Sequence, residues 1–512
     1  MSGSQSPNHW TNSTLGQIVV DIEAGKSFRC IEKPPADGSP GIVKVSAVSW
    51  GSFNENESKT CPDEKLFNSR HQIYPGDLLM SRANTIELVG ACVIVGSVSK
   101  RLMLSDKILR IIAQDDLKAW ILWYLRSKEG RAQIEDRATG NQLSMRNIGQ
   151  ASILEIAIPL APDRERLSIV EAIESYLSRL DDAMTTLERV QRNLKRYRAS
   201  VLKAAVEGRL VPTEAELARA EGREYEPASV LLERVLVERS RRWEEAELAK
   251  MEAKGKVLKN DKWKAKYVEP ARPDTRELPE LPESWCWASF SQLLLRLQTG
   301  PFGSSLHKTD YVTGGTPVIN PQQLQGFGIC PSEKVAVGPD TVARLSSFLL
   351  QDGDIVLGRR GEMGRCALVG TRESGWLLGT GSLALKPIES INASFLLWVL
   401  RSPLSVATLE GKSVGTTMTN LNQEILYGLP MPLPPCHEQK RIVQEIERHF
   451  SLIENLEREV VTQLAKSSCL RQSILKWAFE GRLVDQDPND EPAEVLLERI
   501  RRQAPGARRS RR

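Results

Sequence analysis

The sequence predicts an α+β fold in which two mixed, β-rich domains are separated by two long helices that form an antiparallel coiled coil. The chain repeats itself: EGRLV at 207–211 returns at 480–484, and EPASVLLER at 226–234 returns as EPAEVLLER at 491–499. In each copy, short strand-like runs precede a helical stretch whose apolar residues recur about every seven positions. The repeat is far longer than a solenoid unit of about 20–50 residues. The chain therefore holds two copies of one large unit, with an internal pseudo-two-fold relation.

Length and composition are those of a globular protein. The 512 residues are 41% hydrophobic and 26% charged, with a net charge of +4. This charge neither requires nor excludes nucleic acid, since a local patch matters more than the sum. The start MSGSQSPNHW lacks the features of a signal peptide, and no apolar run approaches the about 18 residues of a membrane span. The eight cysteines form no CxxC pairs, which predicts reduced thiols and a cytoplasmic location.

The β-rich parts are predicted over residues 1–161 and 285–434. A Gly-Asp pair opens an apolar run in each copy, at Gly76 and at Gly353. Alternating apolar residues and β-branched content in these parts favour strands. The related segments LWYLRS and LWVLRS predict a short helix in each copy.

The apolar period changes to seven after the proline that closes each β-rich part. We predict a spacer helix within 162–210 and a second spacer helix with its tail within 435–503. The expected seams consist of Ile173, Leu180, Leu187, Leu194 and Val201, and of Ile446, Ile453, Val460 and Ile474. Gly208 and Gly481 lie where a left-handed C-cap is expected. Pairing of the two helices with each other is favoured over the alternative that each packs on its own domain.

A connector over residues 211–284 joins the copies, and a basic tail, 504–512, is expected to be disordered. The connector begins with a helical segment and continues into a Lys- and Pro-rich stretch. There, a lysine cluster surrounds Trp263 and Tyr267. Such a cluster fits either a contact with nucleic acid or a linker that packs its aromatic rings onto a neighbour. We favour the linker.

The sequence lacks the motifs of an enzyme. There is no P-loop and no Gly-rich loop that would hold a dinucleotide or a methyl donor. The segment 320–323 comes nearest to a catalytic Asn-Pro-Pro-aromatic tetrad, but it lacks the second proline and the aromatic residue. The five histidines are not at metal-ligand spacing, and Glu438 at the start of the second long helix is explained by the helix dipole. We therefore expect a non-catalytic chain that holds no metal and no cofactor.

The order of these segments resembles the specificity subunit (HsdS) of type I restriction-modification systems, over about residues 10–505. The resemblance is carried by PDRERLSIVEAIE (162–174) and PCHEQKRIVQEIE (435–447), by both copies of EGRLV and of EPA-VLLER, and by KWKAKYVEP before LPELPESW. One departure is that the first long helix begins Pro-Asp-Arg-Glu-Arg where the second has Pro-Cys-His-Glu-Gln-Lys. This weakens a Glu-Gln signature in the first copy.

The resemblance implies that the β-rich parts are target recognition domains of a non-catalytic subunit. Such a subunit binds a bipartite, asymmetric target in double-stranded DNA, with no membrane association. Its expected partners are two modification (methyltransferase) subunits and restriction/translocase subunits, to which S-adenosylmethionine, ATP and Mg²⁺ would bind. The alternatives are a stand-alone sequence-specific DNA-binding regulator and a coiled-coil scaffold.

Loops of the β-rich parts supply the candidate DNA contacts. Arginine pairs well with guanine, and Asn or Gln with adenine, whereas phosphate contacts set the register. The candidates are Lys26, Arg29, Arg82, Asn84, Gln142, Ser144 and Arg146 in the first domain, and Lys308, Arg359, Arg360, Arg365, Thr416 and Asn420 in the second. The alternative is that several of them cap turns or form surface ion pairs.

Overall fold

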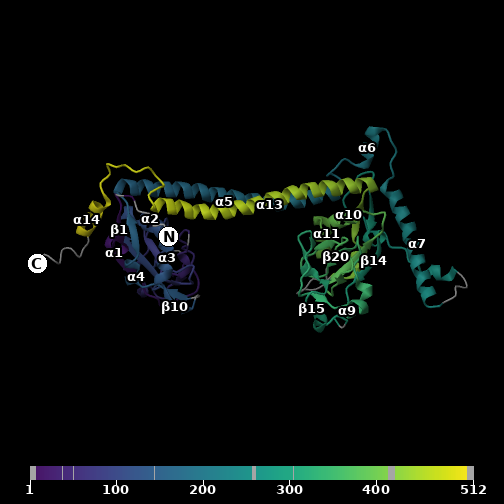
Figure 1. Cartoon of the computed structure of the whole chain (residues 1–512), viewed down its shortest axis with the longest axis horizontal. Coiled ribbons are helices and arrows are strands. Elements are labelled where there is room, and N and C mark those ends of the chain that lie inside the picture. Colours follow the sequence, from purple (N-terminus) through teal and green to yellow (C-terminus); the bar gives the residue numbers. More distant parts are fainter. Residues whose placement is uncertain are drawn as a thin grey trace. The chain divides into compact units, whose positions relative to one another are not determined.

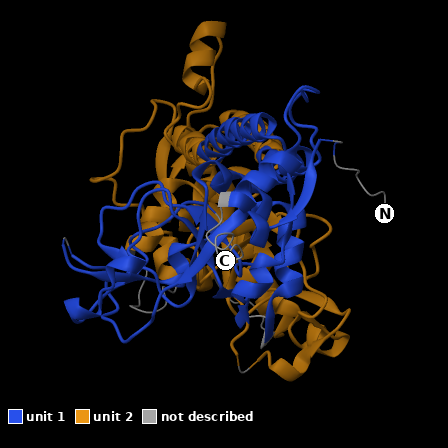
Figure 2. Ribbon diagram, turned by 90° about the vertical axis from the view of Figure 1, so that its left-hand side faces the viewer, with its two compact units in different colours: residues 1–189, 460–512 blue, residues 190–459 orange. Residues whose placement is uncertain are grey.

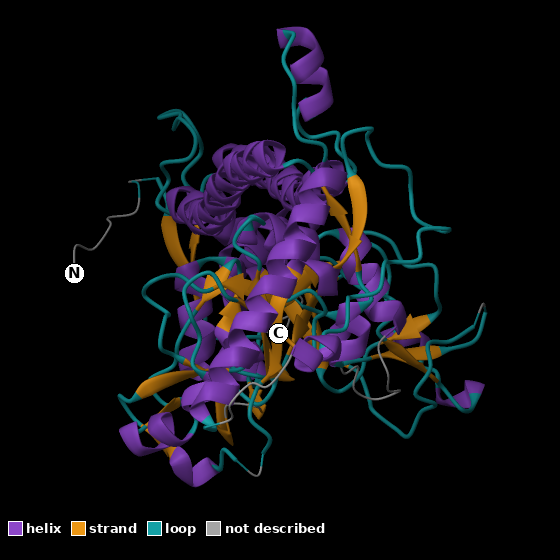
Figure 3. Ribbon diagram, turned by 90° about the vertical axis from the view of Figure 1, so that its right-hand side faces the viewer, coloured by secondary structure: helices purple, strands orange, loops and turns teal. Residues whose placement is uncertain are grey.

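The computed structural model describes residues 7, 9–36, 38–49, 51–142, 145–255, 261–303, 305–412 and 421–503. The chain divides into two compact units, residues 1–189 with 460–512 and residues 190–459 (Figure 2). The division passes through the two long helices, α5 (Asp163–Val206) and α13 (Cys436–Phe479). Each unit therefore contains part of both long helices. Sheets and shorter helices make up the rest of the regular structure, and Figure 3 colours helices and strands separately.

Unit 1 is built around a four-stranded antiparallel sheet. Its strands, in order across the sheet, are β2 (Val19–Ala24), β9 (Ile108–Ala113), β5 (Leu78–Ser81) and β7 (Cys92–Ile94). The predicted Gly-Asp strand is β5. Gly76 turns into it with a φ of +85°, a left-handed value that favours glycine. The Asp77 carboxylate accepts a hydrogen bond from the Tyr74 N–H at 2.9 Å, which closes the turn.

Smaller sheets and helices surround this sheet. The strands are β1 (Thr11–Thr14) with β12 (Ala157–Leu160), β4 (Ser58–Thr60) with β3 (Gly41–Val43) and β8 (Leu102–Met103), and β10 (Thr139–Gln142) with β11 (Met145–Asn147) and β6 (Ala83–Asn84). The helices are α1 (Leu15–Ile18), α2 (Asp115–Arg126), α3 (Lys128–Arg137), α4 (Gln150–Leu154) and α14 (Ala493–Gln503).

The core of unit 1 takes residues from both ends of the chain. The start of α5 buries Ile169 and Ile173 against the domain, and the end of α13 buries Phe479 there. The Phe479 ring meets Trp120 at 4.8 Å and Tyr124 at 5.0 Å, both edge-on. The C-terminal α14 packs on α1 within this core. The first β-rich domain is thus completed by helices of the second copy.

Unit 2 repeats the plan. Its central sheet has the order β14 (Leu294–Thr299), β23 (Ser382–Pro387), β20 (Ile355–Gly358) and β21 (Cys366–Leu368). The other strands are β13 (Cys286–Ser289), β15 (Tyr311–Val312), β16 (Thr316–Ile319), β17 (Leu324–Gln325), β18 (Gly328–Ile329), β19 (Ala336–Val337), β22 (Leu377–Leu378) and β24 (Pro430–Leu433). The helices are α6 (Glu214–Glu221), α7 (Ala228–Ala253), α8 (Phe290–Leu293), α9 (Pro339–Arg344), α10 (Ala393–Leu400), α11 (Pro403–Lys412) and α12 (Gln423–Tyr427).

In unit 2 the end of α5 and the start of α13 share one core with the domain. Val201 and Ala205 come from α5, and Ile446 and Phe450 from α13. Phe450 packs edge-on against Trp398 of α10 at 4.9 Å. Each long helix therefore packs on its own domain at its start and on the domain of the other copy at its end.

The long helices contact each other within each unit. In unit 1, Arg471 pairs with Asp181. In unit 2, Arg198 pairs with Glu457 at 3.3 Å. The predicted seam residues are buried except Leu187, which is half-buried. Both helices span 44 residues.

The predicted helix ends are confirmed. α5 ends at Val206 and α13 at Phe479, and the glycines that follow have a φ of +66°. Gly208 and Gly481 thus take the left-handed C-cap conformation.

The aromatic residues of the connector pack on α7. Trp263 is buried and stacks on Trp243 at 6.0 Å, and Tyr267 lies 5.4 Å from the same indole. This arrangement agrees with the interpretation of a packing linker, since Trp263 does not present its face to solvent. The predicted tail 504–512 lies outside the described residues.

Candidate nucleic-acid interface

One edge of the unit 1 sheet gathers loops from three distant parts of the sequence. Because β9 is antiparallel to both of its neighbours, its first residues lie beside the last residues of β2 and β5. The register places Ala24 opposite Leu109, and Ser81 opposite Ile108. Candidate residues on the loops after β2 and after β5 are therefore brought to the same edge.

The loops at this edge are held together by backbone contacts. Gly25 approaches the backbone of Leu104 so closely that a Cβ would lie 1.9 Å from the Leu104 carbonyl oxygen. The Ser27 hydroxyl donates to the Asp106 carboxylate, and the Arg82 N–H donates to the Lys107 carbonyl at 2.9 Å. The edge is thus a connected surface and not a set of independent loops.

The predicted cations Lys26 and Arg29 lie on the loop that begins at Gly25, and both are exposed. The structure adds Lys107, which is also exposed and immediately precedes β9. The sequence showed Lys107 only as a charged residue in a short Ser-Asp-Lys turn. Its significance comes from strand order, which brings β9 between β2 and β5.

The small sheet of β10, β11 and β6 brings together Arg82, Asn84 and Arg146. Asn84 and Arg146 are direct partners across β6 and β11. The Arg82 Nε donates to the Asn147 side chain at 3.4 Å. The Arg146 guanidinium donates to the carbonyls of Ala138 at 2.5 Å and Gly140 at 2.7 Å, so it braces the sheet.

This small sheet lies at the end of unit 1 away from α5, where Figure 1 labels β10. Gln142 is the last residue of β10. Ser144 lies outside the described residues.

The equivalent edge of unit 2 has the same construction. Thr299 lies opposite Leu383, and Gly358 opposite Ser382. The Arg359 N–H donates to the Gly381 carbonyl at 2.9 Å. The Arg359 carbonyl accepts from Leu421, as the Arg82 carbonyl accepts from Ile148 in unit 1. Arg82 and Arg359 therefore occupy equivalent positions in the two domains.

The arginines of unit 2 differ in how far they are engaged. Arg359 is half-buried and donates to the Leu421 carbonyl at 3.2 Å; burial, and then the charge of Arg360, lower its pKa. Arg365 pairs with Glu362 at 2.9 Å. Arg360 is exposed and has no hydrogen-bond or ion-pair partner among the described residues. Arg360 is thus the arginine of this turn that is most available to a ligand.

Lys308 is exposed on a short 3₁₀ turn, Lys308–Asp310. Thr416 and Asn420 lie outside the described residues.

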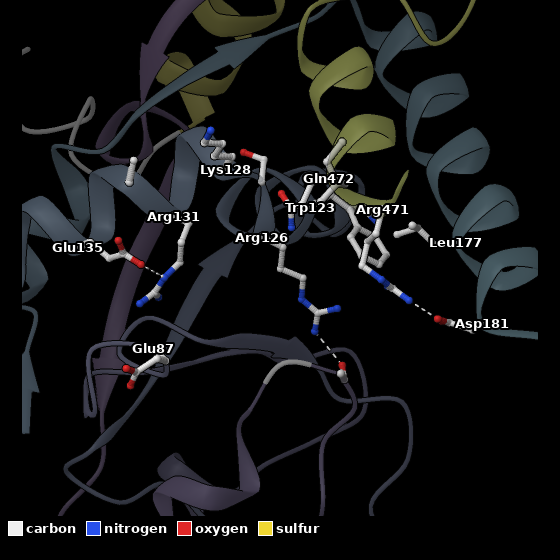
Figure 4. A pocket seen from close by; sticks show the side chains of 14 residues that line it. Glu87, Trp123, Arg126, Lys128, Arg131, Glu135, Leu177, Asp181, Arg471 and Gln472 are labelled. Carbon is white, nitrogen blue, oxygen red and sulfur yellow. Dashed lines mark hydrogen bonds and ion pairs between the residues drawn. The ribbon is translucent and has the colours of Figure 1, made fainter. Parts of the chain in front are cut away.

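A sizeable cavity of unit 1 lies elsewhere. It has a volume of about 840 Å³ and lies between α2, α3, α5 and α13 (Figure 4). Several of its charged side chains are engaged in its own wall: Arg126 donates to the Gly51 carbonyl at 2.7 Å, and Arg471 pairs with Asp181 (Figure 4). The candidate DNA contacts do not line it.

Among the described residues, no three His, Cys, Asp or Glu side chains are placed to hold a metal ion. None of the helices in the described part of the chain is long and apolar enough to cross a membrane.

Several known proteins are similar to this chain in sequence. The family model of the type I restriction modification DNA specificity domain matches residues 302–464. The EcoBI specificity subunit of Escherichia coli is 22% identical over 94% of this chain and 90% of its own length. The EcoKI specificity subunit of E. coli (strain K12) is 21% identical over 98% of this chain and 97% of its own length. Together these matches support an HsdS protein, the specificity subunit of type I restriction-modification systems.

Further type I proteins are similar to this chain in sequence or in fold. The EcoEI specificity subunit of E. coli is 30% identical, although the match spans 36% of this chain and 32% of that protein. The crystal structure of the HsdS subunit from Thermoanaerobacter tengcongensis has a TM-score of 0.53 at 17% identity and covers 94% of this chain and 99% of that one. A chain from a structure of a type I R-M system has a TM-score of 0.61 at 16% identity, covering 93% and 99%.

The similar proteins also bear on whether this chain is an enzyme. The relatives are specificity subunits, which are non-catalytic parts of type I restriction enzyme complexes. The prediction that this chain is not an enzyme is confirmed on that ground.

Proposed function

We propose that this chain reads the DNA sequence for a type I restriction-modification complex. The observation that carries the proposal is the pair of equivalent sheet edges. Both place an arginine, Arg82 or Arg359, at the end of the same strand with the same backbone hydrogen bonds. Two such edges suit a target with two separate parts, since base edges in the major groove distinguish every base pair.

The proposed target is asymmetric because the two edges differ in chemistry. Arg82 is followed by Ala83 and Asn84, whereas Arg359 is followed by Arg360 and Gly361. Asparagine pairs best with adenine and arginine with guanine. We therefore expect two different half-sites, separated by a spacer that the chain does not read.

Apolar patches on the long helices support docking of partner subunits. In unit 1, Tyr176 of α5 and Leu470 and Trp477 of α13 are 46%, 44% and 42% exposed, and they border a groove of about 530 Å³. Exposed apolar groups that gather in this way are typical of protein interfaces.

Unit 2 carries a related patch. Tyr197 of α5 and Leu452 and Leu456 of α13 are 47%, 51% and 52% exposed. One patch in each unit fits two copies of a modification subunit. The restriction/translocase subunits would join this assembly, and S-adenosylmethionine, ATP and Mg²⁺ would bind those partners.

Co-expression of the chain with a modification subunit tests the proposal. The purified chain with S-adenosylmethionine and DNA should transfer no methyl group, and the assembled complex should methylate adenine in a two-part sequence. If the chain alone binds DNA tightly and sequence-specifically, this would instead support the alternative of a stand-alone DNA-binding regulator. If the assembled complex methylates DNA without sequence preference, only the alternative of a coiled-coil scaffold remains.

The docking patches have their own test. Trp477→Ala in unit 1 and Leu452→Ala in unit 2 should each reduce the number of bound modification subunits from two to one, measured by native mass spectrometry. Leu167→Ala is the matched control, because Leu167 is 49% exposed but faces away from Tyr176 on α5. The placement of the patches would be contradicted if the control variant lost a modification subunit. It would also be contradicted if both patch variants still bound two modification subunits.

A further inference from the structure

Lys107 occupies the centre of the unit 1 edge. It follows Asp106 and immediately precedes β9, the strand between β2 and β5. Its carbonyl accepts the Arg82 N–H at 2.9 Å, so its backbone is tied to that candidate arginine. Its side chain is exposed and has no partner among the described residues.

The backbone around Lys107 is rigid. Gly25 packs against Leu104 without room for a side chain. The Ser27 hydroxyl and Asp106 are joined twice, because the Asp106 N–H also donates to the Ser27 oxygen at 3.4 Å. This contact occupies the Asp106 carboxylate, the acidic group next to Lys107 in the chain.

The surroundings of Lys107 are cationic. Lys26 is the neighbour of Ser27, Arg29 lies two residues further on, and Arg82 is bonded to Lys107 through its backbone. The three segments joined at this edge, 25–29, 82–84 and 104–107, thus carry four cations and one carboxylate, Asp106, which is already hydrogen-bonded to Ser27. A field of this sign attracts an anion, and the phosphates of DNA are the anions that a subunit of this kind meets.

We infer that Lys107 binds a backbone phosphate of the DNA half-site read by unit 1. The inference rests on the proposed function and names a contact within it. A lysine ammonium is a point charge on a flexible stem, which suits a phosphate better than the two-point reading of a base. The rigid loops fix where that charge stands, so the contact sets the register of the domain on the duplex.

The equivalent position of unit 2 carries a glycine in place of this lysine. Arg359 donates its N–H to Gly381, as Arg82 does to Lys107, so Gly381 stands in the place of Lys107. The additional cation of that edge is Arg360, one residue after Arg359. Removal of Lys107 should therefore affect only the half of the interface that unit 1 forms.

The test uses the complex assembled with its modification subunit. Affinity for target DNA is measured at several salt concentrations for the wild type, Lys107→Ala and Lys107→Arg. Each phosphate contact contributes about 0.9 to the slope of log affinity against log salt. Lys107→Ala should reduce the slope by about that amount and weaken all target sequences equally, and Lys107→Arg should restore the slope.

Controls separate the possible failures. Lys195→Ala removes an exposed lysine from α5 and should leave the slope unchanged. An unchanged slope in Lys107→Ala, or a change in which bases are preferred, would overturn the phosphate contact while the proposed function stands. A wild-type complex that binds DNA without sequence preference would overturn the proposed function, and this inference with it.

Discussion

The indole Nε1 of Trp285 donates a hydrogen bond to the Glu438 carboxylate at 2.7 Å. Unit 1 repeats the bond, since Trp10 donates to Glu165 at 3.0 Å. Both pairs join the segment that enters a β-rich domain to the first turn of the long helix that leaves it. The internal repeat is therefore a repeat of buried polar contacts as well as of sequence.

Removal of the Glu438 carboxylate should destabilise unit 2. In Glu438→Ala the buried Trp285 N–H and the Glu214 N–H, which donates to Glu438 at 2.8 Å, both lose their acceptor. One unsatisfied buried donor costs about 1–3 kcal/mol. In urea unfolding, the free energy of unfolding of Glu438→Ala should be lower than that of wild type by at least this amount. Glu438→Gln should retain part of the stability. Equal stability of Glu438→Ala and wild type would contradict the role of the pair.

Glu438 should also make stability depend on pH. Burial raises its pKa above the ordinary value of 4.5, against the opposing effect of the hydrogen bonds and of Arg441. The folded state then holds the proton more tightly than the unfolded state, so this contribution is present below the unfolded pKa and is lost as pH rises through the folded pKa.

Glu438→Gln cannot titrate, so it isolates this effect. The free energy of unfolding of wild type minus that of the variant should decrease as pH rises from about 4.5 towards neutrality. A difference that stays constant over this interval would show that Glu438 does not titrate as expected.

Phe327 is predicted to be a main contact between the second domain and the long helices. Its ring lies 4.7 Å from the Arg401 guanidinium, 4.9 Å from that of Arg198 and 5.2 Å from the Phe450 ring. Phe327→Ala loses both apolar contact and two cation–π contacts, and should cost about 2–4 kcal/mol. Phe327→Leu should recover the apolar part. A change below about 0.5 kcal/mol in Phe327→Ala, measured by denaturation, would rule this contact out as a main one.

The close approaches at the two sheet edges should not tolerate a methyl group. A Cβ at Gly25 would lie 1.9 Å from the Leu104 oxygen, and one at Gly300 would lie 1.9 Å from the Gly379 oxygen. Gly25→Ala and Gly300→Ala should each destabilise by about 1–3 kcal/mol and weaken target binding. Gly96→Ala is the control, because nothing lies within 4 Å of its added Cβ. If Gly96→Ala lowers stability and target binding as much as the edge variants do, then steric clashes at the sheet edges are not the cause of those losses.

The long helices and their ends could be predicted because they depend on local patterns. The seven-residue apolar period marks α5 and α13, and Gly208 and Gly481 mark where they stop. What the helices contact could not be predicted, since an apolar stripe does not specify which surface buries it. The placement of Phe479 in the core of the first domain follows only from the folded chain.

The partners of the buried polar side chains could not be predicted from the sequence either. The helix dipole accounts for a first-turn Glu438, but its role as the acceptor for Trp285 needed the distance between them. The departure at the start of the first long helix also has a structural reason. Arg166 is fully buried and donates to Asp116 at 2.6 Å, whereas Gln439 in the second copy accepts from the Asn392 N–H at 3.0 Å.

The candidate site was predicted in part. Arg82 and Arg359 were found because they follow a recognisable strand, and the structure makes them equivalent. Lys107 was missed because the order of strands in a sheet cannot be read from a single sequence. The roles of all these residues toward DNA stay predictions.

Methylome mapping of Arg82→Ala and Arg360→Ala complexes tests the central claim most directly. We predict a two-part methylated sequence for the wild type, with relaxed base preference in one half-site for Arg82→Ala and in the other half-site for Arg360→Ala, because the two residues belong to different units. The spacer should remain unchanged in both variants. A single continuous palindrome, or relaxation of the same half-site by both substitutions, would contradict the claim that each unit reads its own part of the target.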